Sequence, residues 1–558
     1  MKKWVPTCII LVGFLGCALL YFCVGFYYED HSGLASLFQS GIVTGGRPAS
    51  DFYIYCQTFT SAFFSFLTLY VAKISWVDFA YIFLLFMAYC FSATMVLNVL
   101  FPQPIKKRIA TIFSILFFVL FFADSFVFFS WVRLSYIGTF LLLLGCLWVT
   151  ETNPESKLKW WLYFFTVLLF SLCLFIRYET GIAACVAVGV YLICRGGSMA
   201  IVSKALALPF VITALFIVYL YFKADEIPFL KQTEPALYYI SDAVNNPNFF
   251  SSKPQIDSIK NLAVLNYFII DEGIITVDFI QSMATQKTRL FSQNSTTIFE
   301  NLKVAYHLTL PFITKYVELV LLHLVAFLFL LRKTKGSSRL GIFVFNLFIA
   351  GIVVGMAYGI KMEDRIFISL LITGSICNLL FIEKISIENR KIGWVIRLAI
   401  AVLLLSFSTR FVARAVAFKK ETLKIEHLAH TIDRRAKGKY LYLDVHSNWL
   451  LRGALFRSSV MPNVKQILFY DAGQLGLLPF FKTIADNTCQ CKSAHVDQYF
   501  HFLQNEANNL ILISTINRMG FIKGYLELVH HQKIVFEQGE KITDGNDLYY
   551  FTIKQNRP

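Results

Sequence analysis

Long apolar stretches separated by short polar loops fill most of the chain up to residue 410. A helix needs roughly 20 apolar residues to cross the hydrocarbon core of a bilayer, and the chain provides such runs repeatedly. We therefore predict a mostly α-helical, polytopic transmembrane bundle. About eleven spans are expected, near residues 5–27, 76–100, 109–128, 131–150, 160–176, 179–194, 205–222, 309–331, 340–360, 366–382 and 393–410.

The composition points the same way. Hydrophobic residues make up 57% of the chain and charged residues only 15%, with a mean hydropathy of +0.60. So little polar surface excludes a soluble particle of this length. The basic N-terminus precedes a long apolar run without a small-residue cleavage site, so we expect an uncleaved first span.

Residues 51–75 are also apolar enough to cross the bilayer, but they include Asp51, Gln57 and Lys73. If this segment instead forms a juxtamembrane or re-entrant helix, the basic loops share the side of the N-terminus, and the positive-inside rule makes that side cytoplasmic. We therefore predict that it does not cross. The basic residues concerned are Lys2, Lys3, Lys106, Lys107, Arg108, Lys157, Lys159, Arg195, Lys204, Arg332, Lys333, Lys335, Arg339, Lys384, Arg390, Lys391 and Arg397.

This topology divides the chain into a bundle at 1–410, with external loops 28–75 and 223–308, and an extracytoplasmic tail at 411–558. The expected location is the bacterial inner membrane. One basic stretch conflicts with the topology because it follows the last span, but five basic loops on the other side outweigh it. The stretch contains Arg414, Lys419, Lys420, Lys424, Arg434, Arg435, Lys437 and Lys439.

The tail has a different pattern, in which short alternating runs near 439–445, 464–470, 509–514, 533–537 and 548–553 predict strands with helices between them. A small α/β domain is expected. The neighbours Asp444 and His446 have no nucleophile at a readable spacing. Cys489 and Cys491 lack the two further ligands that a zinc site needs, so neither pair is assigned a function.

Several enzyme classes have no local support. The sequence contains no Walker A motif, no Rossmann glycine fingerprint, no HExxH and no GxSxG, which argues against nucleotide-driven pumping, hydride transfer and serine-type hydrolysis. No nucleic-acid partner is expected either.

The remaining candidates are ionisable residues near the outer membrane boundary. A charged side chain is costly inside a membrane, by about 2.5 to 3.5 kcal/mol at the centre of a helix, so residues of this kind are functional candidates by default. Arginine binds phosphate through two parallel hydrogen bonds, so a lipid-linked phosphate is a natural ligand at this depth. Ordinary ion pairing within each turn is the competing explanation. The residues are Glu29, Asp30, Asp124, Arg133, Arg177, Glu179, Lys361, Glu363, Asp364 and Arg365.

This layout and three short motifs resemble the GT-C superfamily of integral membrane glycosyltransferases, which includes protein O-mannosyltransferases and bacterial lipid A aminoarabinose transferases. An external soluble domain after the last span is also frequent there. The motifs are the acidic pair Glu29-Asp30 before a juxtamembrane segment, the turn Arg177-Tyr178-Glu179, where many relatives have Arg-Pro-Glu, and Arg365-Ile366, similar to an Arg-Tyr-Leu pattern that opens a late span.

The resemblance implies transfer of a sugar from a polyprenyl-phosphate donor to a lipid, glycan or protein acceptor on the extracytoplasmic face, for cell-envelope glycoconjugates. It implies that Asp30 or Glu29 is the catalytic base. No cofactor or metal site is assigned, although carboxylates in the first loop suit a divalent cation. The donor phosphate would be bound by Arg177, Arg365 and Arg133, with support from Glu179, Asp124, Asp364, Arg47 and Asp51.

Two other classes stay open. A secondary transporter or flippase also places charges in a membrane cavity, but it predicts internal repeats, and the sequence shows no convincing symmetry. A surface-polysaccharide polymerase or ligase shares the lipid-linked substrates and external arginines, but it does not require an acidic first loop.

Overall fold

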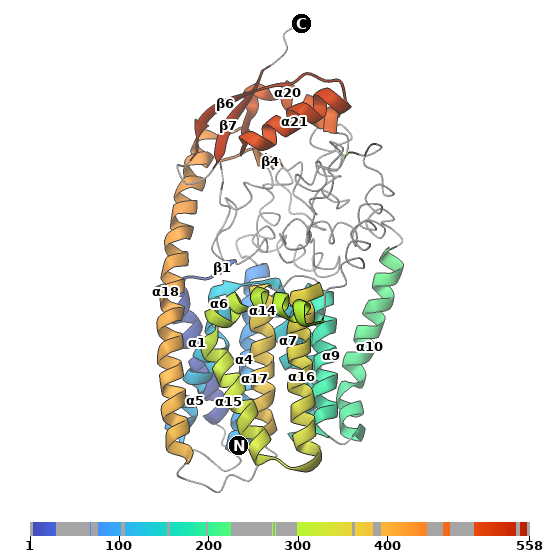
Figure 1. The fold of residues 1–558 in the computed structure, drawn as a ribbon, viewed down its shortest axis with the longest axis vertical. Helices are drawn as coiled ribbons and strands as arrows, with labels where there is room; N and C mark the ends of the chain where they lie inside the picture. The colour runs from blue at the N-terminus through green and yellow to red at the C-terminus, as the bar shows by residue number, and fades with distance from the viewer. Residues whose placement is uncertain are drawn as a thin grey trace.

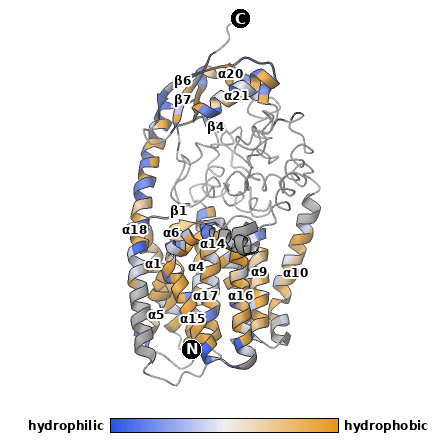
Figure 2. Ribbon diagram, in the orientation of Figure 1, coloured by the Kyte–Doolittle hydropathy of each residue, from blue (hydrophilic) through white to orange (hydrophobic). Residues whose placement is uncertain are grey.

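The computed structural model describes residues 4–28, 67, 76–101, 106–152, 157–196, 199–224, 271, 274, 298–359, 363–382, 392–443, 461, 463–468, 496–542 and 547–554. Apolar helices form a transmembrane bundle, and a small α/β domain lies beyond one end of it (Figure 1). Hydrophobic residues dominate the bundle, whereas polar residues are frequent in the domain and in the adjoining half of the longest helix (Figure 2). The predicted fold class is confirmed.

Seven of the described helices are long and apolar enough to cross a membrane, and an eighth span is present if the bent pair α14–α15 counts as one. The buried helix α7 lies at the centre and packs against α4, α8, α9, α10 and α17. The bundle helices are α1 (Trp4–Cys23), α4 (Trp76–Leu100), α5 (Lys107–Phe121), α6 (Ala123–Val127), α7 (Trp131–Thr152), α8 (Lys157–Ile176), α9 (Tyr178–Arg195), α10 (Met199–Ala224), α14 (Ile298–Lys315), α15 (Val317–Lys333), α16 (Gly336–Gly359), α17 (Asp364–Phe381) and α18 (Ile392–Arg435).

Every predicted span contains a helix, but two of them are broken. The predicted span 309–331 turns by 90° between α14 and α15, so α14 lies across the bundle end that faces the domain (Figure 1). Two charged residues, Lys315 and Glu318, flank this break, and charges are costly deep in a bilayer. Within the predicted span 109–128, α5 ends at Phe121. The five-residue α6 and the short strand β2 (Phe128–Phe129) follow it.

Parts of the predicted external loops lie outside the described residues. This holds for almost all of 51–75 and for most of 223–308. Within the second range, however, α14 already begins at Ile298. The end of the predicted loop, residues 298–308, is therefore helical.

The helix α18 is 44 residues long and runs without a break through residue 411, where the sequence predicted the soluble domain to begin. At 1.5 Å per residue it measures about 66 Å, roughly twice the thickness of a hydrocarbon core. Its first half packs against α5 and α15, and its second half projects to the domain (Figure 1).

The C-terminal domain is built on a five-stranded mixed sheet with the order β4-β3-β5-β7-β6. β3 is parallel to β4 and β5, whereas β7 is antiparallel to β5 and β6. Each strand overlaps a range that the sequence predicted. The elements are β3 (Tyr440–Leu443), β4 (Gln466–Leu468), α20 (Val496–Asn505), β5 (Leu510–Thr515), α21 (Ile516–Val529), β6 (Val535–Lys541) and β7 (Leu548–Lys554).

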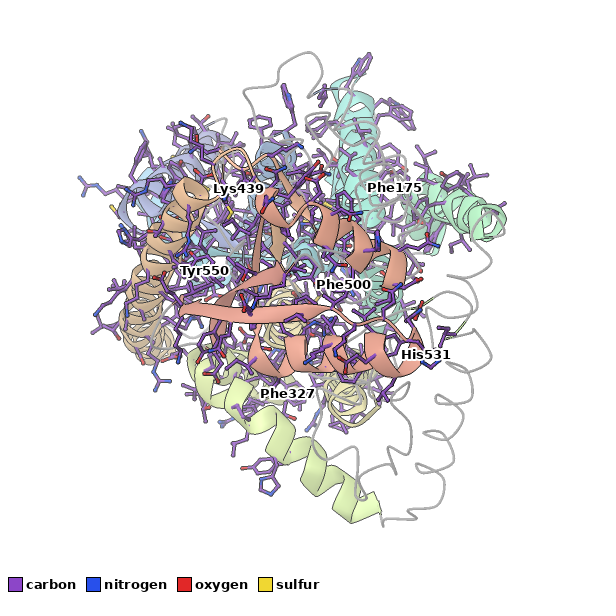
Figure 3. The ribbon with its side chains drawn as sticks, turned by 90° about the horizontal axis from the view of Figure 1, so that it is seen from above. Phe175, Phe327, Lys439, Phe500, His531 and Tyr550 are labelled. Carbon is purple, nitrogen blue, oxygen red and sulfur yellow. The ribbon has the colours of Figure 1, made fainter. Side chains whose placement is uncertain are left out.

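A separate apolar cluster holds the helices of this domain against its sheet. Tyr499 and Phe500 of α20, Leu526 of α21 and Phe551 of β7 are all buried in it. Arg435, the last residue of α18, lies 4.0 Å from the ring centroid of Tyr550. Viewed from above, the sheet lies over the bundle end (Figure 3). Asp444, His446, Cys489 and Cys491 are outside the described residues.

Candidate active site

The two broken spans bring ionisable side chains together at the bundle end that faces the domain. Asp124 lies on α6, Arg133 on α7, Lys315 at the end of α14, Asp364 at the start of α17 and Arg414 on α18. We call these five residues, together with Tyr316 at the α14–α15 bend, the charged network. It contains three cations and two carboxylates, so an excess of positive charge favours anions there.

Asp124 is held between two guanidinium groups. Arg133 donates from Nη1 to Asp124 Oδ2 at 2.6 Å, and the two side chains are only 1% and 2% exposed. Arg414 forms an ion pair with the other oxygen, Oδ1. Its guanidinium carbon also lies 4.6 Å from the ring centroid of Phe128 and 5.1 Å from that of Tyr316. A carboxylate buried so deeply is stable only with such partners.

Asp364 forms the more accessible side of the network. Its Oδ2 accepts a 3.0 Å hydrogen bond from the Tyr316 hydroxyl and forms an ion pair with Lys315. Arg133 Nη2 lies 3.5 Å from the same oxygen, so Arg133 bridges both carboxylates. The side chain of Lys315 is 36% exposed and that of Asp364 18%, which makes Lys315 the cation that a ligand reaches most easily.

A second buried carboxylate fixes α18 to the bend. Glu318 of α15 is 3% exposed and lies 3.1 Å from Arg410 Nε, and the Ser406 hydroxyl donates to it at 2.6 Å. Arg410 also donates to the backbone oxygen of Thr314 at 3.0 Å. Arg410 and Arg414 are four residues apart and therefore share one face of α18. This face contacts the bundle on both sides of the bend.

The other two predicted arginines pair with acids of their own turns. Arg177 Nε lies 3.6 Å from Glu179 Oε2, and Arg365 pairs with Glu363. Each turn also adjoins the network through the backbone. Arg365 follows Asp364 directly, and the Arg177 carbonyl accepts a 2.8 Å hydrogen bond from Ser135 on α7.

The predicted base lies outside the described residues, as do Arg47, Asp51 and Lys361. The chain leading to Glu29 and Asp30 is nevertheless placed, because β1 (Tyr27–Tyr28) pairs in parallel with β2, with Tyr28 opposite Phe129. That pairing brings residue 28 to the connection between α6 and α7, the two helices that carry Asp124 and Arg133.

Sequence reasoning missed Lys315 and Tyr316 and set Arg414 aside as part of a basic tail. A signal for Lys315 was present, because a lysine inside a predicted span is a functional candidate by default. No local signal identified Arg414, since its partner Asp124 is distant in the chain.

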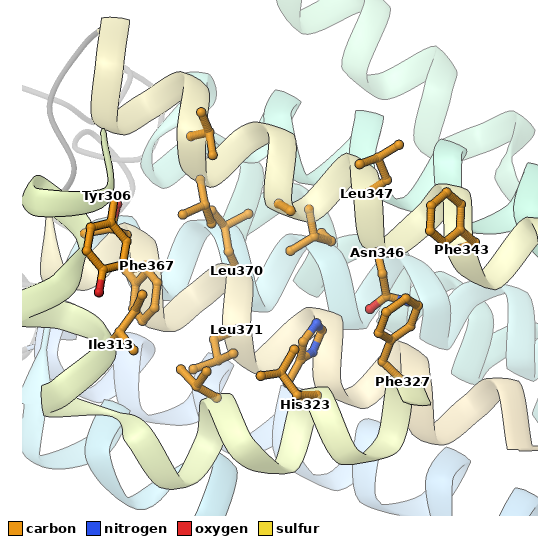
Figure 4. A pocket seen from close by; sticks show the side chains of 17 residues that line it. Tyr306, Ile313, His323, Phe327, Phe343, Asn346, Leu347, Phe367, Leu370 and Leu371 are labelled. Carbon is orange, nitrogen blue, oxygen red and sulfur yellow. The ribbon is translucent and has the colours of Figure 1, made fainter. Parts of the chain in front are cut away.

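An apolar cavity of about 470 Å³ lies between α14, α15, α16 and α17 (Figure 4). Ile313 and Phe367 line one end of it, and the Phe367 ring lies 6.4 Å from the Tyr316 ring, centroid to centroid. The lining residues Phe343 and Leu347 are 47% and 59% exposed. The cavity therefore opens sideways, toward the region that lipid chains occupy around the bundle.

One wall of the cavity carries polar groups. His323 Nδ1 lies 3.3 Å from the Ser375 hydroxyl and 3.5 Å from the Asn378 amide nitrogen. Asn346 and Asn378 exchange two amide hydrogen bonds of 3.0 Å. A Cβ atom on Gly374 would lie 3.1 Å from His323 Cε1, so this glycine leaves room for the imidazole ring.

Across the part of the chain that the structure describes, no group of three or more His, Cys, Asp or Glu side chains is placed to hold a metal ion.

No sequence profile of a known protein family matches the chain, and no curated protein matches it significantly. Among solved structures, the crystal structure of ArnT from Cupriavidus metallidurans in the apo state aligns over 98% of this chain and 97% of that chain. The sequence identity is 11% and the TM-score 0.38. Values this low establish neither a shared fold nor a shared activity.

Proposed function

We propose that this protein is a membrane glycosyltransferase of the GT-C type. It transfers a sugar from a polyprenyl-phosphate donor to an acceptor on the extracytoplasmic face, in the synthesis of cell-envelope glycoconjugates. The observation that carries the proposal is the contact between the apolar cavity and the charged network. A polyprenyl phosphate joins a long apolar chain to an anionic head, so its binding site must offer both surfaces side by side.

Named residues form this junction. Phe367 lines the cavity and packs against Tyr316, whose hydroxyl is bound to Asp364. Ile313 also lines the cavity, two residues before Lys315. A lipid chain in the cavity would therefore direct its phosphate toward Lys315. A cavity of about 470 Å³ falls within the range typical of ligand pockets.

The transfer needs a base and several cations. The acceptor hydroxyl or amine forms a bond to the anomeric carbon while the bond from that carbon to the phosphate oxygen breaks. The phosphate leaves with the bonding electrons, and the base takes the acceptor proton. We assign the base to Asp30, with Glu29 as the alternative. Tyr28, which directly precedes this acidic pair, lies in β1 beside β2, at the connection between α6 and α7.

The cations offset the charge that grows on the leaving phosphate. Arg177 and Arg365 remain the proposed phosphate ligands, joined by Lys315 and Arg414. Arg133, which is 1% exposed and bridges two carboxylates, is better placed to orient the network than to leave its partners for a ligand. Glu179, Asp124 and Asp364 then act as supports that hold the cations in position.

The experiment uses the full-length protein in liposomes with a panel of undecaprenyl-phosphate hexoses and pentoses and a lipid extract of the source organism as acceptor. We expect release of undecaprenyl phosphate, measured by mass spectrometry, and its loss in Asp30→Asn. This substitution changes proton affinity and hardly alters side-chain volume. Glu29→Gln is the matched control and should remain active.

Two outcomes would contradict the proposal. Wild-type rates in both Asp30→Asn and Glu29→Gln would rule out this acidic pair as the base. Movement of intact donor between leaflets, without release of undecaprenyl phosphate from any member of the panel, would establish a flippase instead.

A further inference from the structure

The face of α18 that points away from the bundle changes character along its length. Leu405, Val412 and Val416 are apolar and 70%, 52% and 58% exposed, as expected for side chains in contact with lipid. Beyond Val416 the exposed positions include Lys420 and Lys424. The helix thus passes from an apolar to a basic surface.

The neighbouring helix α1 shows at which depth in the membrane the surface of α18 changes from apolar to basic. Phe22 near its end is 79% exposed, so the apolar surface of α1 extends to that level. Lys419 Nζ donates to the backbone oxygen of Cys23, the last residue of α1, at 3.1 Å. Lys424 lies five residues further along α18, or about 7.5 Å. The headgroup layer is itself about 5 to 8 Å thick on each side, so these lysines lie at its depth.

Among the described residues, neither Lys420 nor Lys424 forms an ion pair, and one exposed acid, Glu421, lies beside them. Deeper on the same helix, by contrast, Arg410 and Arg414 are paired with buried carboxylates. An outward-facing positive surplus at headgroup depth is complementary to phosphodiester groups.

An apolar side chain lies within this basic surface. Leu423 is 54% exposed and lies between Lys420 and Lys424 in the sequence. Surfaces that bind the membrane interface combine basic side chains with apolar ones that reach the acyl boundary. Lysines that only kept the helix in water would need no such neighbour.

We propose that Lys419, Lys420 and Lys424, with Leu423, form a docking surface for anionic phospholipid headgroups in the leaflet next to the C-terminal domain. Bound headgroups fix the height of α18 in the membrane. Because Arg414 is on the same helix, the bound headgroups also help to keep Arg414 opposite Asp124.

The test is native mass spectrometry of the full-length protein from micelles that contain equal amounts of phosphatidylglycerol and phosphatidylcholine. We expect Lys419→Gln/Lys420→Gln/Lys424→Gln to lose affinity for phosphatidylglycerol by about fivefold per lysine. Retention of phosphatidylcholine should not change. The double variant Lys420→Gln/Lys424→Gln alters only exposed side chains and serves if the triple variant fails to fold.

The matched control replaces three exposed lysines of the C-terminal domain region, Lys437, Lys523 and Lys533, by glutamine. It lowers the net charge of the protein equally and should retain wild-type lipid binding. The proposal is overturned if the α18 variants keep the wild-type ratio of the two lipids, or if the control variant loses phosphatidylglycerol to the same extent.

Discussion

At the residue scale, burial sets the importance of each ion pair. The Asp124–Arg133 pair is almost fully buried, whereas the side chains of Arg177 and Glu179 are 18% and 41% exposed. When a buried charge loses its partner, no water can take the partner's place. An exposed charge is solvated instead and loses little. Similar turns in the sequence should therefore differ widely in their effect on stability.

Asp124→Ala should destabilise the protein by about 3 to 5 kcal/mol, because Arg133 and Arg414 both lose their buried carboxylate partner. Glu179→Ala, at the exposed pair, should cost less than about 1 kcal/mol. Denaturant titration of both variants in detergent measures the difference. In the double variant Asp124→Leu/Arg133→Met, part of the stability should return, because the buried Arg133 charge is removed while Arg414 still lacks its carboxylate partner. Equal losses in the two single variants would contradict the structure.

At the element scale, close contacts between helices depend on small residues. A Cβ atom on Gly341 of α16 would collide with the backbone oxygen of Cys194 on α9. Backbone cannot move aside as a flexible side chain does, so this glycine permits the approach of the two helices. Gly351, on the same helix, has no atom within 4 Å of its Cβ position.

Gly341→Ala should therefore lower the free energy of unfolding by about 1 to 3 kcal/mol through overpacking. Gly351→Ala is the control and should be neutral or stabilising, since alanine favours a helix over glycine by up to about 1 kcal/mol. Thermal unfolding in detergent distinguishes them. A Gly341→Ala protein as stable as the control would show that α9 and α16 are not in contact.

The 90° bend at Tyr316 is also decided between elements. Arg410 of α18 reaches Thr314 before the bend and Glu318 after it. The bend places Lys315 beside Asp364 and leaves the cavity below it. Its geometry thus depends on a helix that the chain reaches only much later.

At the scale of the whole molecule, the C-terminal domain has two described connections to earlier parts of the chain. The continuous helix α18 is one connection. The other is Asp271, which lies in the chain between α10 and α14 and is fully buried. Its Oδ2 accepts a 2.8 Å hydrogen bond from the Tyr525 hydroxyl and lies 2.6 Å from His530 Nε2. The domain and the connection between α10 and α14 therefore share a buried polar contact.

The buried tyrosines make the domain sensitive to alkali. Burial raises the pKa of Tyr499, and burial together with the charge of Asp271 raises that of Tyr525. A tyrosine whose pKa is raised in the folded protein stabilises the fold at pH values below the pKa of an unfolded tyrosine, about 10. This contribution to the free energy of unfolding is lost as the pH rises above that value. We expect stability to fall steeply above about pH 10, and less steeply in Tyr499→Phe/Tyr525→Phe.

Absorbance at the tyrosinate band, followed together with circular dichroism, checks this prediction in the full-length protein. Ionisation of Tyr499 or Tyr525 near pH 10 without loss of structure would contradict the expectation.

The sequence alone determined the membrane class, the helical segments and the strands of the tail. Apolar length and two-residue alternation are local properties, imposed by the bilayer and by the pleat of a strand. It also identified Asp124, Arg133 and Asp364 as candidates. Only the tertiary structure decided their partners, because Arg414 meets Asp124 through packing between distant segments. The same holds for the bend that exposes Lys315, since Arg410 and Glu318 hold it across two helices.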